Sequence, residues 1–240
     1  MIDISNFDWG WMDEPCETYQ IMSDGTHKPM GLYHKDSIIK EIFEGESIYE
    51  LFFEVEENDI VLDVGASLGP FTRSILHKNP KHVFCFEPSY REFKVLVKNT
   101  MGYQVTPIFK GISDKNGISE SDMLFGGESE MESITFKSFI DLFGIDKIDF
   151  LKTDCEGGEY DIFTSGNLPY IKENVKKIVG EWHLSTDELK TKFRNFRDHI
   201  LPNFNKVIIF SVDGIDITWD LWNEHFIEYY TEIIIHIDNR

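Results

Sequence analysis

The sequence predicts an α/β fold in which a doubly wound sheet of seven strands carries helices on both faces. From Asp59 onward, short apolar runs alternate with helical segments, which is typical of a mostly parallel sheet with crossover helices. The first run, residues 60–64, ends in a turn between Gly65 and Gly69, and a helix begins at Pro70. The 240 residues suffice for one sizeable domain and leave little room for a second.

The other elements follow in order along the chain. Each predicted strand is a short apolar run, and each predicted helix shows a cap, a terminating glycine or an apolar stripe. The strands are predicted at 60–64, 82–86, 104–109, 147–153, 175–181, 205–211 and 230–237, and the helices at 70–78, 89–102, 135–143, 158–166 and 185–200. Ser89 with Glu92, and Ser185 with Glu188, are predicted to form capping boxes that satisfy free amides at two helix starts.

Residues 1–57 are predicted to be an N-terminal extension of irregular pattern, rich in aromatic and acidic residues. The extension closes with a predicted helical run over 38–55. Its aromatic side chains either pack on the sheet or form a lid over the site, and packing is the preferred interpretation. They are Phe7, Trp9, Trp11 and Tyr19.

The formal net charge of −20 argues against nonspecific binding to nucleic acid or to an anionic membrane, because both need a positive field. No apolar run approaches the roughly 18 residues of a membrane span. Cys16, Cys85 and Cys155 are odd in number and form no C-x-x-C pair, so neither a disulfide framework nor a zinc knuckle is expected. The sequence therefore predicts a cytoplasmic protein without nucleic-acid or membrane partners.

The turn Gly65-Ala66-Ser67-Leu68-Gly69 predicts a ligand site at the end of the first strand. Glycines there let backbone amides and a helix N-terminus approach a ligand closely. The dinucleotide fingerprint has a further glycine where this chain has Ser67, so a ligand without a pyrophosphate is favoured. The aminocarboxyl end of S-adenosylmethionine (SAM) meets that requirement. An ordinary strand–turn–helix connection is the alternative.

Polar residues also follow the second and third strands, and ligands bind outside the carboxyl ends of such sheets. Glu87 follows the second strand, 24 residues after Asp63, where a carboxylate could accept both hydroxyls of an adenosine ribose. Ser113 and Asp114 could meet an adenine amino group, although an Asx-type turn explains them at least as well.

The fourth strand ends in the densest polar segment, Lys152-Thr153-Asp154-Cys155-Glu156-Gly157-Gly158-Glu159. Strands one and four are neighbours at the switch point of such sheets, so Asp154 is expected beside the glycine turn. There it could orient a cofactor amine, take a proton from a hydroxyl, or bind a divalent ion. Nearby acids make Mg²⁺ or Ca²⁺ conceivable, but Glu156 and Glu159 are equally explained as acids in the first helical turn. No metal is predicted.

The fifth strand runs into Gly180-Glu181-Trp182-His183. A period of two puts Glu181 and His183 on one face and Trp182 on the other. His183 could act as a general base near neutral pH. Alternatively, it caps the strand or pairs with Glu181.

Three segments together resemble the FkbM family of SAM-dependent methyltransferases. They are Val61-Leu62-Asp63-Val64-Gly65-Ala66, Phe86-Glu87-Pro88 with Asn99 closing the next helix, and Ile148-Asp149-Phe150-Leu151-Lys152-Thr153-Asp154-Cys155-Glu156-Gly157-Gly158-Glu159-Tyr160. The resemblance covers about residues 47–183. It implies a Rossmann-like class I methyltransferase sheet over residues 58–240, and O-methylation of a hydroxyl on a saccharide, polyketide or related small molecule.

This chain departs from the family pattern at three positions. Ser67 stands where the family often has Asn, Pro70 replaces a small or aromatic residue, and Gly158 stands where Ala is usual. None of these removes a needed functional group. Ser67 could alter how the methionine carboxylate is held.

The resemblance and the strand ends together give the candidate site. SAM, with S-adenosylhomocysteine (SAH) as product, would be held by Asp63, Gly65, Ala66, Ser67, Gly69, Glu87, Ser113, Asp114 and Asp154. The catalytic candidates are Asp154, His183 and Glu156. Methyl transfer is an in-line displacement that depends on positioning, and a hydroxyl acceptor must also lose its proton. Asp154 or His183 is the predicted base, with Glu156 and Glu181 as orienting groups.

Other functions remain open. A SAM- or nucleoside-binding module without turnover would keep the glycine turn and Glu87 but need not keep the acids of strands four and five. The missing middle glycine argues against a nucleotide-dependent oxidoreductase. The net charge and the absence of an Asn-Pro-Pro-Tyr type loop argue against a nucleic-acid methyltransferase.

Overall fold

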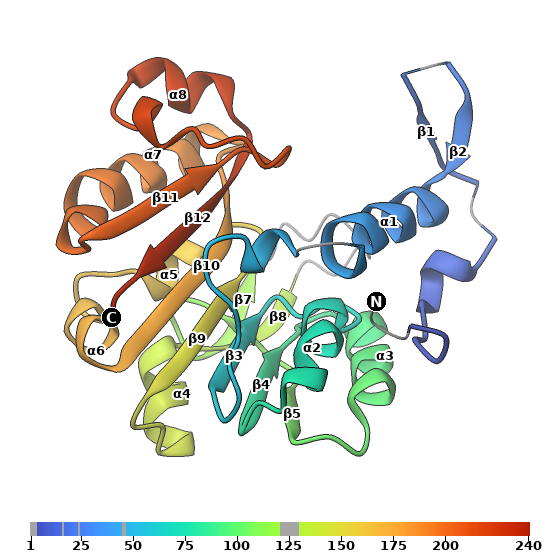
Figure 1. Cartoon of the computed structure of the whole chain (residues 1–240), viewed down its shortest axis with the longest axis horizontal. Helices are drawn as coiled ribbons and strands as arrows, with labels where there is room; N and C mark the ends of the chain where they lie inside the picture. The colour runs from blue at the N-terminus through green and yellow to red at the C-terminus, as the bar shows by residue number, and fades with distance from the viewer. Residues whose placement is uncertain (1–3, 16, 24, 45–46, 121–129) are drawn as a thin grey trace.

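The computed structural model describes residues 4–15, 17–23, 25–44, 47–120 and 130–240. At its centre is a seven-stranded sheet in the order β11-β12-β10-β9-β3-β4-β5. Figure 1 shows α2 and α3 on one side of this sheet and α4 and α6 on the other. The predicted doubly wound sheet with helices on both faces is confirmed.

The seven strands lie close to the predicted runs. They are β3 (Ile60–Val64), β4 (His82–Phe86), β5 (Val105–Ile108), β9 (Ile148–Thr153), β10 (Val175–His183), β11 (Lys206–Phe210) and β12 (Glu232–Asp238). Five of them pair in parallel, from β10 through β9, β3 and β4 to β5, whereas β12 runs antiparallel to both β10 and β11. The parallel strands therefore end at one edge of the sheet, and strands one and four of the prediction, β3 and β9, are neighbours as expected.

Eight α-helices and several short 3-10 or π turns connect the strands in the described part of the chain. The helices are α1 (Met30–Ile38), α2 (Pro70–Ile75), α3 (Tyr90–Thr100), α4 (Phe136–Phe143), α5 (Glu159–Ile162), α6 (Leu168–Asn174), α7 (Asp187–Asn195) and α8 (Glu224–Tyr229). The turns are η1 (Gly10–Asp13), η2 (Ile39–Phe43), η3 (Ile48–Glu50), η4 (Leu76–Lys78), η5 (Phe196–Ile200), η6 (Leu201–Asn203) and η7 (Thr218–Asp220). Within the described ranges, none of the helices has the length and apolar character needed to cross a bilayer.

The predicted helix over 38–55 is wrong in its bounds. Helix α1 begins earlier, at Met30, and continues through the π turn η2 only to Phe43. Glu44 is extended, and the later turn η3 starts afresh with Ser47, whose hydroxyl accepts the amide of Tyr49. The apolar spacing thus continues along the sequence while the helical backbone does not.

Two small sheets were not predicted. One is the hairpin of β1 (Tyr19–Ile21) and β2 (His27–Pro29), and the other joins β6 (Gly111–Ile112), β7 (Gly117–Glu120) and β8 (Glu130–Ile134) in the order β6-β8-β7. Each of these strands has only two to five residues. Such short runs carry too little alternation to be distinguished from loops.

Neither predicted capping box forms. Ser89 precedes α3, but its side chain makes no cap; instead its amide donates to Glu87 at 2.7 Å. Glu92 lies close to the side chains of Trp11 and Ser67. Helix α7 is capped by Thr186, whose hydroxyl accepts the amide of Leu189. The residues of the first predicted box contact other parts of the fold instead of each other. The cap of α7 is Thr186, one residue after the predicted Ser185.

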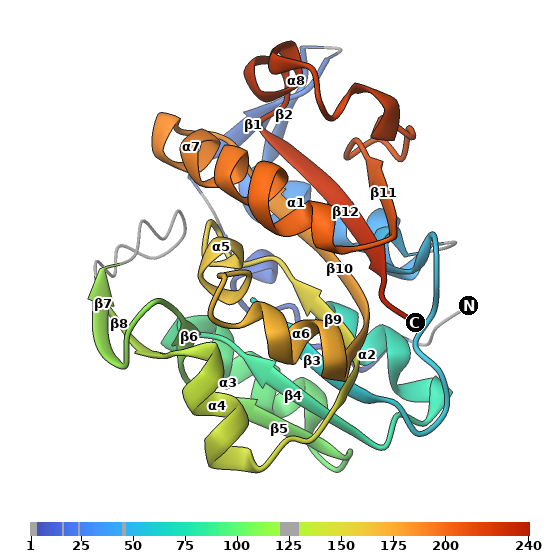
Figure 2. The same cartoon turned by 90° about the vertical axis from the view of Figure 1, so that its left-hand side faces the viewer.

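Each face of the sheet packs against its own core. On the face seen in Figure 2, helices α4 to α7 cover a core that includes Phe139, Trp182 and Phe196. The opposite core combines Phe71 of α2 with residues of the N-terminal extension, among them Phe7, Trp9, Phe43 and Phe53. Phe7 and Trp9 therefore pack on the domain, whereas Tyr19 is 53% exposed.

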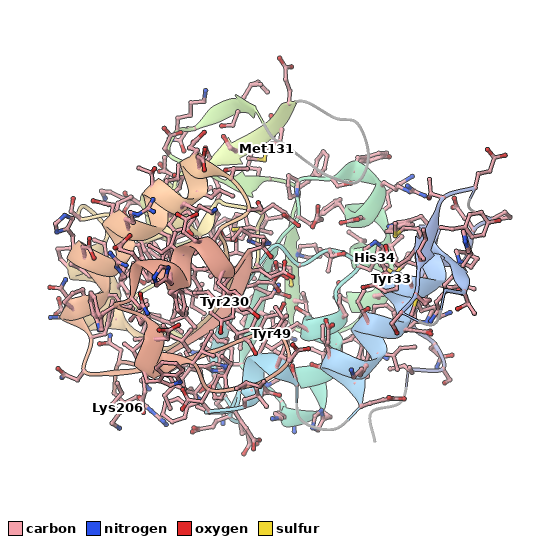
Figure 3. All side chains as sticks on the ribbon, turned by 90° about the horizontal axis from the view of Figure 1, so that it is seen from above. Tyr33, His34, Tyr49, Met131, Lys206 and Tyr230 are labelled. Atoms are coloured by element: carbon pink, nitrogen blue, oxygen red, sulfur yellow. The ribbon has the colours of Figure 1, made fainter. Side chains whose placement is uncertain are left out.

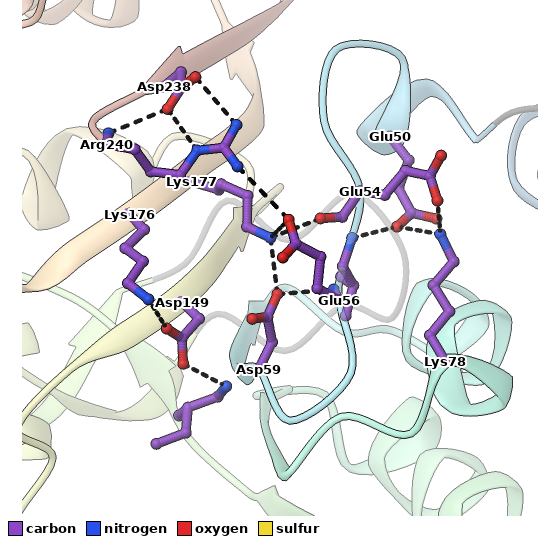
Figure 4. Close-up of polar contacts among 12 residues, drawn as sticks. Glu50, Glu54, Glu56, Asp59, Lys78, Asp149, Lys176, Lys177, Asp238 and Arg240 are labelled. Carbon is purple, nitrogen blue, oxygen red and sulfur yellow. Dashed lines mark hydrogen bonds and ion pairs between the residues drawn. The ribbon is translucent and has the colours of Figure 1, made fainter.

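Two lysines fix the segment that leads into β3 (Figure 4). Lys177 of β10 is buried and donates to the Glu54 carbonyl at 2.8 Å and to the Asp59 carboxylate at 2.9 Å. Lys78 donates to Glu50 at 3.0 Å. The extension is thus attached to the sheet by charge as well as by packing.

We expect Lys177→Met to lower the free energy of unfolding by about 3–5 kcal/mol, because it leaves a buried carboxylate without its cation. The neighbouring Lys176 is half exposed, and its partner Asp149 also has Lys147 at 2.9 Å. Lys176→Met should therefore cost less than about 1 kcal/mol. Urea unfolding measures both, and equal losses would contradict the anchoring role of Lys177.

Candidate functional site

The glycine turn is tightly enclosed between the ends of two strands. Gly65 has φ +74°, and a Cβ there would lie 1.7 Å from the carbonyl oxygen of Asp154. The amides of Gly65 and Ala66 donate to the Phe86 carbonyl at 3.1 and 2.9 Å. Only glycine can occupy position 65, because the end of β9 passes directly against it.

Gly69 provides the second left-handed residue, with φ +86°, immediately before α2. Its amide donates to the Ala66 carbonyl at 2.8 Å, which closes the turn. Ser67 also has positive φ, at 50°, and its amide donates to Glu87 at 2.8 Å. The Ser67 side chain lies close to Glu92. The predicted turn residues therefore form one rigid, compact loop.

Asp63 is fully buried at the end of β3. One carboxylate oxygen accepts the Thr72 hydroxyl at 2.8 Å, and the other lies 3.1 Å from the Lys152 ammonium. Asp63 therefore acts on the site by holding α2 and Lys152, rather than through an exposed oxygen.

Lys152 has a role at the site that was not predicted from the sequence. Its buried ammonium donates to the Gly65 carbonyl at 2.8 Å and lies 3.8 Å from Asp154. Burial lowers the pKa of Lys152, but Asp63 and Asp154 outweigh that effect and raise it. A lysine within the otherwise buried strand Ile148–Thr153 needs a counter-ion. Its place in a buried strand was the signal that could have predicted an ion pair here.

Glu87 lies beside the turn, as predicted for a ribose acceptor. Its two carboxylate oxygens accept the amides of Ser89 and Ser67 at 2.7 and 2.8 Å. Burial raises the pKa of Glu87, and the nearby Glu92 carboxylate raises it further. A carboxylate so short of positive partners would gain from two hydroxyl donors, which is consistent with the predicted contact to a ribose.

Ser113 and Asp114 follow β6 and belong to the small sheet. The Ser113 amide donates to the Ile134 carbonyl at 3.2 Å, and its hydroxyl donates to Asp114 at 3.2 Å. Asp114 is exposed. Among the described residues, no hydrogen bond joins this pair to the glycine turn.

Asp154 follows β9 directly and keeps a partly exposed carboxylate. Its amide donates to the Val64 carbonyl at 3.0 Å, and its Oδ2 accepts the Tyr49 hydroxyl at 2.9 Å. The side chain is 30% exposed. The next acid, Glu156, has φ +54° and is 49% exposed. The predicted placement of Asp154 beside the turn is met.

His183 at the end of β10 is surrounded by carboxylates. Its Nδ1 lies 3.1 Å from the buried Glu159, and its Nε2 lies 3.5 Å from Glu156, 3.7 Å from Glu181 and 4.0 Å from Asp154. Burial lowers the pKa of His183, but Glu159, Asp154 and Glu156 together outweigh it and raise the pKa to about 10. An imidazolium cannot accept a proton, so this environment suits a positioning cation better than a general base.

Glu181 and His183 share one face of β10, as the period of two predicts, whereas Trp182 is buried in the opposite core. Burial raises the pKa of Glu181, and the nearby Asp154 and Glu232 carboxylates add to this. The structure thus brings together Asp154, Glu156, Glu181 and His183, although they come from two separate strand ends.

Three of these residues could hold a cation. Asp154, Glu181 and His183 each offer one ligand atom, and the three atoms lie within 4.8 Å of one another. The His183 Nε2 atom lies 3.7 Å from Glu181 and 4.0 Å from Asp154, and an ion about 2.1 Å from both atoms of either pair could bridge it. The set differs from the one considered from sequence, since His183 and Glu181 replace Glu156 and Glu159.

Two surface hollows lie elsewhere. One, of about 460 Å³, is lined by Ile60, Lys81, Phe84, Phe143 and Lys147 among others, at the amino ends of the strands. The other, of about 330 Å³, adjoins Asn79 and Tyr103. Neither contains a predicted site residue.

The chain can now be related to known proteins. Among curated proteins none matches the chain. Solved structures match it at low identity. An rRNA methylase from Streptococcus thermophilus is 9% identical, with 88% of this chain and 96% of that chain covered and a TM-score of 0.46. A Streptococcus mutans protein in complex with SAH is 12% identical, with 88% and 97% covered and a TM-score of 0.47.

Fibrillarin, a pre-rRNA processing protein from Methanococcus jannaschii, is 14% identical, with 95% of this chain and 84% of that chain covered and a TM-score of 0.48. At these values the likenesses carry no argument about activity. The family model described as "Methyltransferase FkbM domain" matches residues 63–207, more than half of the chain, including the glycine turn and both Asp154 and His183. The chain belongs to the FkbM methyltransferase family.

Proposed function

We propose that the chain transfers a methyl group from SAM to a hydroxyl of a small molecule or saccharide. The observation that carries the proposal is the position of the Asp154 carboxylate. It is partly exposed, held by a hydrogen bond, and connected through its own backbone to the glycine turn. A proton acceptor therefore stands directly beside the loop that would hold the methyl donor.

The residues around the turn fit the predicted cofactor. The loop from Gly65 to Gly69 would face the aminocarboxyl end, and Glu87 would accept the ribose hydroxyls. Ser113 and Asp114 remain the candidates for the adenine amino group, with Asp63 supporting the loop through Lys152. When bound, SAM supplies a methyl group on a sulfonium, and an acidic site suits that positive charge.

Asp154 is the base in this proposal. Its Oδ2 is occupied by Tyr49, and its Oδ1 faces the His183 side, where it could take the proton of an acceptor hydroxyl. His183 orients the surrounding acids as an imidazolium, and the half-exposed Glu156 is placed to bind the acceptor. A positioned base contributes roughly 10²- to 10⁴-fold to such a step.

Two alternatives bear on the acceptor and on turnover. A SAM-binding module without turnover would not require the acids of β9 and β10 to converge, and their convergence on His183 favours an enzyme. The net charge of −20 favours an acceptor other than nucleic acid.

The proposed location of the protein is the cytoplasm, because cysteine usage without a disulfide framework suits a reducing compartment.

We expect Asp154→Asn to lower turnover about 10²- to 10⁴-fold, because the amide cannot take up the proton. Calorimetry of SAM and SAH binding measures separately the predicted contribution of Asp154 to holding the cofactor. SAH release from SAM with a panel of monosaccharides and glycosides measures turnover. Asp146→Asn, at an exposed position, is the matched control. If the wild type binds neither SAM nor SAH, the proposed function fails.

Removal of divalent metal should leave SAM affinity and turnover unchanged. Lys152 and the His183 imidazolium already supply positive charge next to Asp154, so an ion is not needed to balance it. Dialysis against EDTA, followed by addition of Mg²⁺ or Mn²⁺, tests this. Activity that disappears with EDTA and returns with the ion would instead assign Asp154, Glu181 and His183 as ligands.

The charge of His183 should make the folded protein less stable as the pH rises. Its pKa is about 10 in the folded state and about 6.5 when unfolded. The stabilisation is therefore complete below about pH 6.5 and is lost as the pH approaches 10. Thermal unfolding midpoints should fall over this window, and less steeply in His183→Gln. His199→Gln, at an exposed site, should keep the wild-type slope; an unchanged slope in His183→Gln would refute the assignment.

A further inference from the structure

We infer that Tyr49 is a positioning residue of this active site, where its phenol fixes the orientation of the Asp154 carboxylate. The inference rests on the proposed function. Tyr49 lies before the region matched by the family model, residues 63–207, and within the segment that the sequence predicts to be an extension. If this segment only packed on the sheet, it would take no part in the reaction.

The contact is direct and selective for one oxygen. The Tyr49 hydroxyl donates to Asp154 Oδ2 at 2.9 Å, across 105 residues of sequence. The Lys152 ammonium lies 3.8 Å from the same oxygen and 5.2 Å from the centre of the Tyr49 ring. Oδ2 is thus held from two sides, which leaves Oδ1 for the acceptor.

Tyr49 can only donate in this bond. Burial raises the pKa of the phenol well above its usual value, and the Asp154 and Glu181 carboxylates raise it further. Near neutral pH the hydroxyl therefore keeps its proton. Its role is to orient and stabilise the ionised carboxylate, not to act as the base.

The backbone around Tyr49 is fixed by contacts on several sides. The Ser47 hydroxyl caps η3 by accepting the Tyr49 amide at 3.3 Å. The Nε2 atom of the buried His236, on β12, lies 3.1 Å from the Ile48 carbonyl. The Tyr49 ring meets Phe71 edge-on at 5.6 Å between centroids. Burial lowers the pKa of His236 to about 4, so a neutral imidazole makes this contact near neutral pH.

The chain after Tyr49 is anchored as well. Glu50 accepts the Lys78 ammonium and the Val55 amide, and Lys177 holds the residues that follow (Figure 4). Figure 3 shows Tyr49 near the middle of the molecule, between the C-terminal part that carries Tyr230 and helix α1 with Tyr33 and His34. The segment therefore delivers its hydroxyl in a fixed direction.

Tyr49→Phe separates positioning from packing, because it keeps the ring and removes only the donor. We expect kcat to fall about 10- to 100-fold, the loss typical of a hydrogen bond to a charged group. The KM of the acceptor and the Kd of SAM should stay within about two-fold. Tyr103→Phe, at an exposed tyrosine that bonds Arg73, should change none of these.

A second readout needs no acceptor. In carboxyl-¹³C NMR of the unliganded protein, the Asp154 resonance is identified by its loss in Asp154→Asn. Tyr49→Phe should shift that resonance, whereas Tyr103→Phe should not. An unshifted resonance, or a normal kcat in Tyr49→Phe, overturns the inference while the proposed function stands. Failure of the wild type to bind SAM or SAH overturns both.

Discussion

The buried ammonium of Lys152 is the contact on which the geometry of the site depends. It joins Asp63 at the end of β3, the carbonyl of Gly65 in the turn, and the carboxylate of Asp154 after β9. Removing one partner from such a buried network leaves charges uncompensated and is costly. Gly65 also lies directly against the Asp154 backbone, so close packing joins the turn to the end of β9 as well. The glycine turn and the proposed base therefore form one unit.

The site is acidic, and its two internal cations have different tasks. Lys152 organises the backbone of two neighbouring strands, whereas His183 balances Glu156, Glu159 and Glu181 on the other side of Asp154. Each acid alone would be an ordinary surface group or a first-turn acid of a helix. Their convergence gives His183 a charge at neutral pH, which changes the role expected of it.

The strands, the glycine turn and the position of Asp154 could be predicted, because each depends on a local run or on the known order of such sheets. The contact between Tyr49 and Asp154 could not, since it spans 105 residues and has no local pattern. His183 was predicted to be a possible base because its neighbours were unknown, and Glu159 comes from a different segment. The caps at Ser89 and Ser185 failed since tertiary partners and a shift of one residue decided them.

The attachment of the extension has a consequence for where the catalytic unit begins. The recognisable pattern starts near β3, and a boundary at residue 58 looks natural in the sequence. A chain that began at residue 58 would lack the Tyr49 hydroxyl that donates to Asp154. It would also lack the Phe53 ring that packs against Phe150. The family pattern, which begins at residue 63, thus leaves out upstream residues that bond Asp154 and pack in the core of the sheet.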